Sequence, residues 1–283
     1  MTIITGLLII CIQFCNMLLE ILGYITALLI GVLLGLIGGG GSVLTVPVLV
    51  YLFGIQPVLA TAYSLFIVGS TSLAGVFTKY RQGLIHIKTA IVFGLPSIIA
   101  VFFTRKYLVP FIPDILTTIG NFVLTKSTAL MLLFAVLMMF ASLSMIRDKS
   151  GKQTDAPSIK HFNYTLILIE GLLVGVLTGL VGAGGGFLII PALVLLTGLP
   201  MRQAVGTSLL IIAAKSLIGF SGDVINYVIN WPFLLLISSI AIVGIFIGGW
   251  MNTKVHPDKL KKGFGWFILF MGIFIIIVEL SKN

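Results

Sequence analysis

Long apolar runs, separated by short polar segments, make up most of the chain. Eight of them are about 20 residues long, the length that an α-helix needs to cross the hydrocarbon core of a bilayer. Two more, 43–53 and 187–197, are apolar but too short to cross as ordinary helices, so they predict half-helices. The pattern predicts an all-α polytopic membrane protein. The eight long runs lie at 17–37, 57–78, 84–104, 126–146, 162–182, 200–222, 232–251 and 264–280.

A glycine-rich break interrupts the apolar pattern twice. The first copy reads Gly35-Leu-Ile-Gly-Gly-Gly-Gly-Ser42 and the second Gly179-Leu-Val-Gly-Ala-Gly-Gly-Gly186. The copies are 179 − 35 = 144 positions apart, and roughly half of the positions from 31 to 75 are identical at this offset. The chain is therefore an internal duplication. We expect a first membrane repeat at 1–147, a cytoplasmic linker at 148–160 and a second membrane repeat at 161–283.

Composition and charge fit a membrane protein and indicate its topology. Hydrophobic residues make up 59% of the chain and charged residues only 9%, against about 25% charged in soluble domains. The net charge of +9 is dispersed over short loops without an aromatic-interleaved patch, so we expect no nucleic-acid partner. The positive-inside rule places three basic segments in the cytoplasm. They contain Lys79, Arg81 and Lys88; Arg147, Lys149, Lys152 and Lys160; and Lys254, Lys259, Lys261 and Lys262.

Loop charge differs between the halves as an inverted repeat requires. Loop 223–231 has no basic residue, although it is the counterpart of basic loop 79–87. Equivalent loops are therefore expected on opposite sides of the membrane. Five crossings per half, with each glycine-hinged pair going in and returning, would invert the second half relative to the first. We expect an inverted repeat of about 8 full transmembrane helices plus two glycine-hinged re-entrant half-helices, located in the plasma membrane. Residues before 17 lack the basic start of a signal peptide, so we expect them to extend or precede the first membrane helix rather than to be cleaved; residues 3–16 could also make an additional partial crossing.

The breaks themselves predict an anion site. Glycine lets the chain turn sharply, and a half-helix that starts at the break points its free N–H groups and positive dipole end toward the membrane centre. The alternative is close helix packing, but packing needs one small residue per turn, and consecutive small residues destabilise a helix. The candidate ligands are Gly39, Gly40, Gly41 and Ser42 in the first break and Gly184, Gly185 and Gly186 in the second.

At these residues the chain resembles the TauE/SafE family of sulfite and organosulfonate transporters, which carry a duplicated Gly-x-x-Gly-x-Gly-Gly-(Gly/Ser) motif followed by an apolar stretch and a proline. The resemblance covers nearly the whole chain, with Pro47 and Pro191 as the two prolines. It implies a carrier of small sulfur oxyanions or sulfonates, such as sulfite or sulfoacetate, or of another small carboxylate.

Ionisable residues at membrane depth are costly and are therefore functional candidates. Lys215 lies about 15 residues into its span and could attract an anion, or it could pair with Glu170 or Asp223. Glu170 is a candidate for proton coupling, or it neutralises Lys215. Glu20 and Asp223 lie nearer helix ends, where a solvated or capping role is expected.

Hydroxyl side chains complete the predicted site, because they can donate hydrogen bonds to an oxyanion; the alternative is ordinary bonding between helices. The hydroxyl candidates are Ser64 with its counterpart Ser208, Ser72 with its counterpart Ser216, and their neighbours Thr71 and Thr207.

A membrane span is expected to end near residue 104. The stretch from Arg105 to about residue 124 is then expected to lie at the membrane interface, where it could contact a second subunit.

These features favour a secondary transporter that holds a small anion near the midplane and works by alternating access. A passive anion channel is the main alternative. An enzyme is not expected, because no histidine or paired aspartate lies at membrane depth to serve as a catalytic base. The histidines share no metal-ligand spacing, so neither a metal nor another cofactor is expected. The expected partners are the small anionic substrate, the lipid bilayer, protons as a candidate coupling ion and a second copy in a homodimer.

Overall fold

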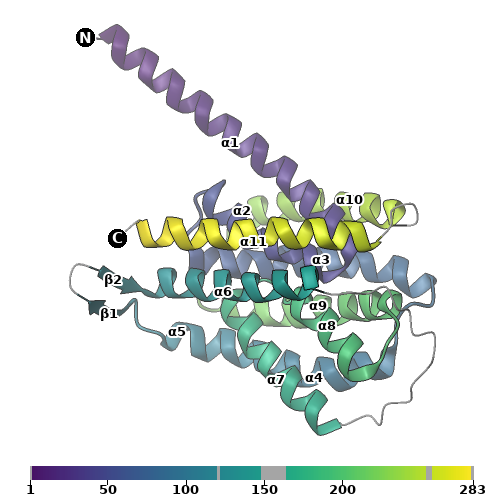
Figure 1. Ribbon diagram of the computed structural model, residues 1–283. Coiled ribbons are helices and arrows are strands. Elements are labelled where there is room, and N and C mark those ends of the chain that lie inside the picture. Colours follow the sequence, from purple (N-terminus) through teal and green to yellow (C-terminus); the bar gives the residue numbers. More distant parts are fainter. Residues whose placement is uncertain (1, 120–121, 148–163, 253–256, 282–283) are drawn as a thin grey trace.

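The computed structural model describes residues 2–119, 122–147, 164–252 and 257–281. Linker 148–160, expected between the two repeats, lies outside these residues. The described chain is a bundle of helices with one small β-hairpin (Figure 1). Its elements are α1 Thr2–Ile37, η1 Gly39–Leu44, α2 Thr45–Tyr51, α3 Pro57–Arg81, α4 Ile87–Phe103, η2 Thr104–Leu108, α5 Val109–Phe111, β1 Ile115–Ile119, β2 Phe122–Thr125, α6 Lys126–Arg147, α7 Tyr164–Val181, α8 Gly186–Thr197, α9 Met201–Val224, α10 Trp231–Met251 and α11 Pro257–Ser281.

Each of the eight long apolar runs forms a helix, as the hydropathy pattern predicts. In the described chain, six helical segments are long and apolar enough to cross a membrane. The other two runs form α7 and α11, whose apolar stretches Thr165–Val181 and Gly265–Ser281 are shorter. The protein is therefore a mostly helical, multi-pass membrane protein. The six segments are Glu20–Ile37, Pro57–Arg81, Ile87–Phe111, Lys126–Arg147, Met201–Val224 and Trp231–Met251.

The two short apolar runs also form the expected short helices. The first contributes to η1 and α2, and the second is α8, which has 12 residues. At the N-terminus, α1 is 36 residues long, so residues 3–16 continue the first helix. At 1.5 Å per residue it is ~54 Å long, far more than one bilayer crossing needs. Its N-terminal part extends away from the rest of the bundle (Figure 1).

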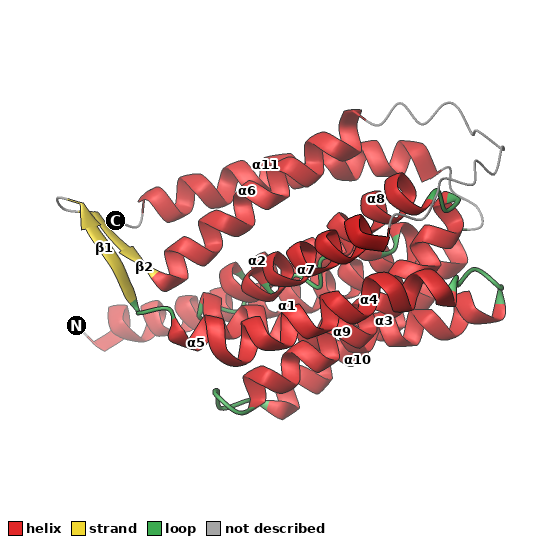
Figure 2. Cartoon of the chain, turned by 90° about the horizontal axis from the view of Figure 1, so that it is seen from below, coloured by secondary structure: helices red, strands yellow, loops and turns green. Residues whose placement is uncertain are grey.

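Helices from opposite halves pack side by side. Helix α1 lies along α10, α7 along α4, and α3 along α9, while α6 pairs with α11 (Figures 1 and 2). At the 144-position offset, α1 corresponds to α7 and α10 to α4. The pair α1–α10 and the pair α7–α4 are therefore equivalent, and each joins the first helix of one half to a later helix of the other half. This arrangement brings the two glycine breaks, which follow α1 and α7, into the middle of the bundle.

Glycines make these helix contacts close. A Cβ atom on Gly31 of α1 would overlap the Ala241 carbonyl of α10, and one on Gly244 would overlap the Leu28 carbonyl of α1. Gly175 is the counterpart of Gly31 in the second half and lies equally close to Ser97 of α4. Small residues at such seams let two backbones approach in a membrane, where the hydrophobic effect does not drive helices together.

The stretch from Arg105 to about residue 124, expected to lie at the membrane interface, forms a helix end followed by a β-hairpin. The helix does not end near 104; it continues through a π-helical turn, η2, into α5 and stops at Phe111. Strands β1 and β2 then form an antiparallel hairpin, with Ile119 opposite Phe122. The short pattern of apolar and polar residues around Ile115 and Thr117 is compatible with a β-strand and with an interfacial helix. Hydropathy alone does not distinguish the two.

The close contact between α1 and α10 leads to a prediction about stability when a single methyl group is added there. Replacing Gly31 with Ala should destabilise the protein by about 1–3 kcal/mol, because the added Cβ forces two backbones apart. The matched control is Gly263→Ala in α11, where a Cβ meets open space. There the higher helix propensity of alanine should leave the melting temperature unchanged or raised. Thermal unfolding in detergent measures both, and equal melting temperatures for the two variants would contradict the close packing at Gly31.

Candidate functional site

Both glycine breaks adopt backbone conformations that side chains disfavour. Gly38, which follows α1, has φ of +77°, and Gly182, which follows α7, has φ of +73°. In the second break Gly184 and Gly185 also have positive φ. Glycine reaches this left-handed region without the steric penalty of a Cβ atom. Glycine is therefore needed at Gly38 in the first break and at Gly182, Gly184 and Gly185 in the second.

The two breaks lie directly against each other. A Cβ atom on Gly39 would overlap the backbone of Gly186, and one on Gly186 would overlap the backbone of Gly39. All the glycines predicted as site residues are buried, as is Ser42, whose Oγ donates a 2.7 Å hydrogen bond to the carbonyl of Gly39. At Gly39 and Gly186 the breaks form a backbone crossing rather than the two walls of an open cavity.

Each break also rests on the central helix of the other half. Gly38 packs against Val205 of α9, and its counterpart Gly182 packs against Thr61 of α3. These are equivalent contacts, since 38 + 144 = 182 and 61 + 144 = 205. Further along, Gly184 lies against Val68 of α3. The helices α3 and α9, which carry all the predicted hydroxyl ligands, therefore line the breaks.

Lys215 brings a positive charge to the second break. Its side chain is fully buried, and its Nζ donates a 3.0 Å hydrogen bond to Thr178 Oγ1 of α7. The same Nζ lies 2.8 Å from where a Cβ of Gly185 would stand, and Ser216 Oγ lies 3.4 Å from the equivalent point on Gly184. The structure thus brings together four of the predicted residues, and Thr178 joins them.

Neither carboxylate that the sequence offers as a partner contacts Lys215. Its polar contact in the described chain is the hydroxyl of Thr178, and Asp223 pairs with Arg105 instead. Glu170 lies eight residues before Thr178 on α7, which is ~12 Å along a helix. It is half-buried there. The structure therefore separates the candidate coupling carboxylate from the buried ammonium.

The predicted hydroxyls fall into two groups. Ser208 Oγ donates to the Val205 carbonyl at 2.8 Å, and Thr207 Oγ1 accepts a 2.9 Å hydrogen bond from the backbone N–H of His86, so both have structural partners. The others are buried, and within the described residues their oxygens have no hydrogen-bond partner. A buried hydroxyl without a partner is costly, and it can donate to an incoming acceptor. This second group consists of Ser64, Thr71, Ser72 and Ser216.

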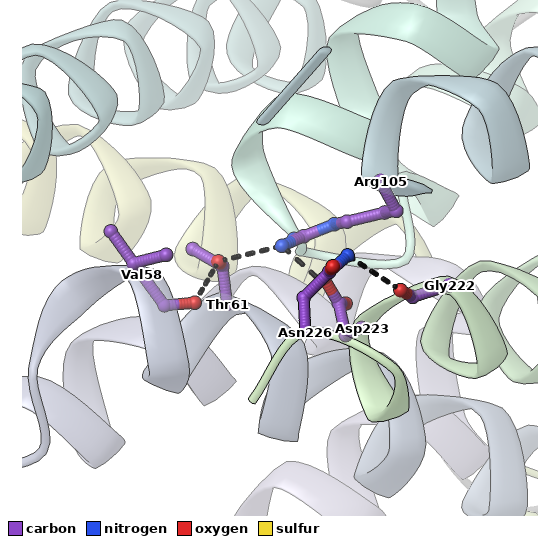
Figure 3. A network of polar contacts seen from close by, with 6 residues as sticks. All are labelled: Val58, Thr61, Arg105, Gly222, Asp223 and Asn226. Carbon is purple, nitrogen blue, oxygen red and sulfur yellow. Dashed lines mark hydrogen bonds and ion pairs between the residues drawn. The ribbon is translucent and has the colours of Figure 1, made fainter. Parts of the chain in front are cut away.

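Arg105 and Asp223 form a buried ion pair that the sequence did not predict (Figure 3). Arg105 Nη1 lies 3.6 Å from Asp223 Oδ2 and donates a 3.0 Å hydrogen bond to Thr61 Oγ1, and both charged side chains are 0% exposed. The guanidinium also lies over Gly182, the glycine of positive φ that directly follows α7. The expectations that Arg105 flanks a span end and that Asp223 is solvated or caps a helix are therefore wrong.

The physical reason is the π-helical turn η2, which contains Arg105. A π-turn carries the helix beyond 104 and redirects its side chains, and such turns are frequent at functional sites. One sequence signal pointed to this residue: 105 + 144 = 249, so Arg105 is the counterpart of Gly249 in the other half. Thr61 and Thr178 accept hydrogen bonds from Arg105 and Lys215. The sequence did not single out either threonine, because a threonine in an apolar helix is common.

The fold and the buried polar centre define a multi-pass membrane protein of the transporter class, in which interrupted helices meet inside the bundle. A family model described as "Sulfite exporter TauE/SafE" matches residues 24–275, and the chain belongs to this family. The resemblance seen in the glycine motifs is therefore confirmed.

Several curated proteins are similar along most of their length. A "probable membrane transporter protein" of Xylella fastidiosa (strain Temecula1) is 30% identical over 256 residues, covering 88% of this chain and 91% of its own. YdhB of Bacillus subtilis (strain 168), also named a probable membrane transporter protein, is 29% identical, covering 83% and 90%. A third, from Methanocaldococcus jannaschii, is 26% identical, covering 92% and 95%. No solved structure matches the chain. Family and relatives together identify a membrane transporter.

The buried pair makes a prediction about stability. Arg105→Met should cost about 3–5 kcal/mol, because it leaves the Asp223 carboxylate buried without a counter-charge. Adding Asp223→Leu should recover most of that loss, since the site then holds two apolar side chains of similar volume. Thermal unfolding of the single and double variants in detergent measures both steps. A double variant as unstable as the single one would mean that the two charges do not interact.

Proposed function

We propose that the protein is a secondary transporter of small anions in the plasma membrane, and that sulfite or organosulfonates such as sulfoacetate are its substrates. The family name supports a sulfur oxyanion, and the names of the relatives support transport. The transported anion binds near the membrane midplane, beside the second glycine break. It is exposed to either side in turn by alternating access.

The observation that carries this proposal is the surplus of positive charge at the start of α8. This helix begins at Gly186 after Gly185, which has no side chain to cap the exposed N–H groups of the first turn. The N-terminus of a helix is its positive end, and the Lys215 ammonium lies beside it. The α8 N-terminus and the Lys215 ammonium repel each other, and no carboxylate of the described residues contacts Lys215. An anion bound between these two positive groups is therefore strongly favoured. The Ser216 hydroxyl, which has no partner within the described residues, contributes a hydrogen bond, and Thr178 holds the ammonium in place.

Reciprocal contacts between the halves support an inverted repeat as the moving machinery. The N–H of His86 donates to Thr207 in the second half, and the N–H of its counterpart Asn230 donates to Tyr63 in the first, at 2.9 Å and 2.7 Å. Paired contacts of this kind are what a pseudo-two-fold axis produces. Two nearly equivalent halves give two nearly equivalent conformations, each open to one side, which alternating access requires.

Glu170 is the proposed coupling group. It stands on α7, the helix that also positions Thr178, yet ~12 Å from the Lys215 partner. A half-buried carboxylate at membrane depth can take up and release a proton without cancelling the charge that binds the anion. Protonation and anion binding are then linked through α7 rather than by direct contact.

The test is uptake of radiolabelled sulfite and of sulfoacetate into liposomes that contain the purified protein, with and without a pH gradient. Saturable uptake that responds to the gradient supports a proton-coupled carrier. Flux that rises linearly with concentration indicates a passive channel, and saturable uptake of a simple carboxylate that excludes both sulfur anions assigns the carrier to another substrate. Protein integrity is checked by melting temperature before reconstitution.

Lys215→Met should weaken anion binding at least tenfold, because a hydrogen bond from a charged donor contributes about 1.5–3 kcal/mol. The measured quantity is the KM of sulfite uptake. The matched control is Lys88→Met, which removes the same charge from an exposed position at the start of α4. An unchanged KM for Lys215→Met in folded protein would remove Lys215 from the binding site.

Glu170→Gln should separate coupling from binding. The variant cannot release a proton, so a pH gradient should no longer accelerate uptake, whereas exchange of labelled for unlabelled sulfite at equal pH should continue. The comparison of gradient-driven uptake with exchange is the measurement. Gradient-driven uptake that persists at the normal rate would exclude Glu170 as the coupling group.

A further inference from the structure

A cavity lined by a positive charge lies away from the glycine crossing. It is a pocket of about 310 Å³ between α1, α3, α9 and α10. This volume is at the lower end of the range of small-molecule sites. Its polar lining comes from the end of α3, where Thr78, Lys79 and Gln82 face it, and Gly35 and Gly249 form its floor where α1 meets α10.

Lys79 is the unusual group in this pocket. Its side chain is only 7% exposed, and within the described chain it has neither a hydrogen bond nor an ion pair. Arg202, at the start of α9, lies close enough to act electrostatically on it, and this neighbour is also positive. No residue that lines the pocket is acidic. A buried ammonium without a counter-charge is costly, so it needs a ligand of the opposite sign.

The other half of the chain shows what happens when such a position is closed. Lys79 corresponds to Asp223 (79 + 144 = 223), and Gly249, which lines the pocket, corresponds to Arg105 (105 + 144 = 249). There the Arg105 side chain is buried against Asp223 (Figure 3), whereas a Cβ on Gly249 would meet open space. One half therefore fills the place with its own ion pair, and the other leaves a cation facing a cavity.

We propose that this pocket is a second anion site, which binds a small tetrahedral oxyanion or sulfonate on Lys79. By the positive-inside rule it lies at the cytoplasmic end of the molecule, beside basic loop 79–87. Gly35, the first glycine of the motif, joins the pocket to α1 one turn before the first break. The pocket holds the anion on its way to or from the crossing; this transport role rests on the proposed function, whereas binding itself does not.

Equilibrium binding of radiolabelled sulfate in detergent tests the site without requiring transport. Every variant carries Lys215→Met, so that binding near the second break does not contribute, and potassium chloride keeps the ionic strength constant. This protein should bind sulfate saturably, and adding Lys79→Met should weaken binding at least tenfold. Lys79→Arg should retain binding, and so should the exposed control Lys88→Met.

A second variant tests the site without replacing Lys79, because replacing Lys79 could itself affect folding. Gly249→Leu should abolish sulfate binding by filling the pocket while Lys79 stays in place, and its melting temperature should be close to that of its parent. Absence of saturable binding in the Lys215→Met protein, or equal binding after Lys79→Met, overturns the site. Sulfite uptake by the wild-type protein without Lys79-dependent binding overturns this site alone. Lys79-dependent binding without any uptake leaves the site standing and overturns the proposed transport.

Discussion

Backbone groups inside a membrane need hydrogen-bond partners or shielding, and the two chain breaks of this protein depend on that constraint. Gly38 and Gly182 turn the chain at membrane depth, where an irregular segment facing lipid would be very costly. The breaks are tolerated because they are buried against each other at Gly39 and Gly186 and against α3 and α9. The glycine seams between α1 and α10 and between α7 and α4 hold the helices close enough to make this shielding complete.

Three of the four cations that are buried in the described chain show how differently one protein accommodates positive charge. Arg105 is neutralised by Asp223 and donates a hydrogen bond to Thr61, Lys215 donates to the hydroxyl of Thr178, and Lys79 faces a pocket without a partner. Each side chain is at most 7% exposed, so water screens its charge only weakly. Within the described residues, only Arg105 has a carboxylate partner. Uncompensated positive charge attracts anions and repels cations, and this is the property that the proposed transport of a small anion requires.

The halves are related in sequence but unequal in chemistry. Their framework contacts recur at the 144-position offset, as with the two backbone hydrogen bonds to Tyr63 and Thr207. Their buried charged residues do not recur: Lys215 stands opposite Thr71, Asp223 opposite Lys79, and Arg105 opposite Gly249. The two halves therefore share a framework of contacts and differ in the charged side chains that they bury.

The sequence alone determined the helical framework and the place of its breaks. Apolar runs of span length, the short runs 43–53 and 187–197 and the repeated glycines are local features, and the structure places helices and turns at each of them. The approach of Lys215 and Ser216 to the second break could also be anticipated, because the duplication marked α9 as its lining.

Only the tertiary structure decided which polar groups meet. Lys215 and Thr178 are 37 positions apart, and Arg105 is 44 positions from Thr61 and 223 − 105 = 118 from Asp223. Such pairs depend on helix packing and on one π-helical turn, neither of which hydropathy records. The pocket at Lys79 likewise exists because Gly249 lacks a side chain to fill it, and a single glycine in an apolar helix gives no sign of the cavity beside it.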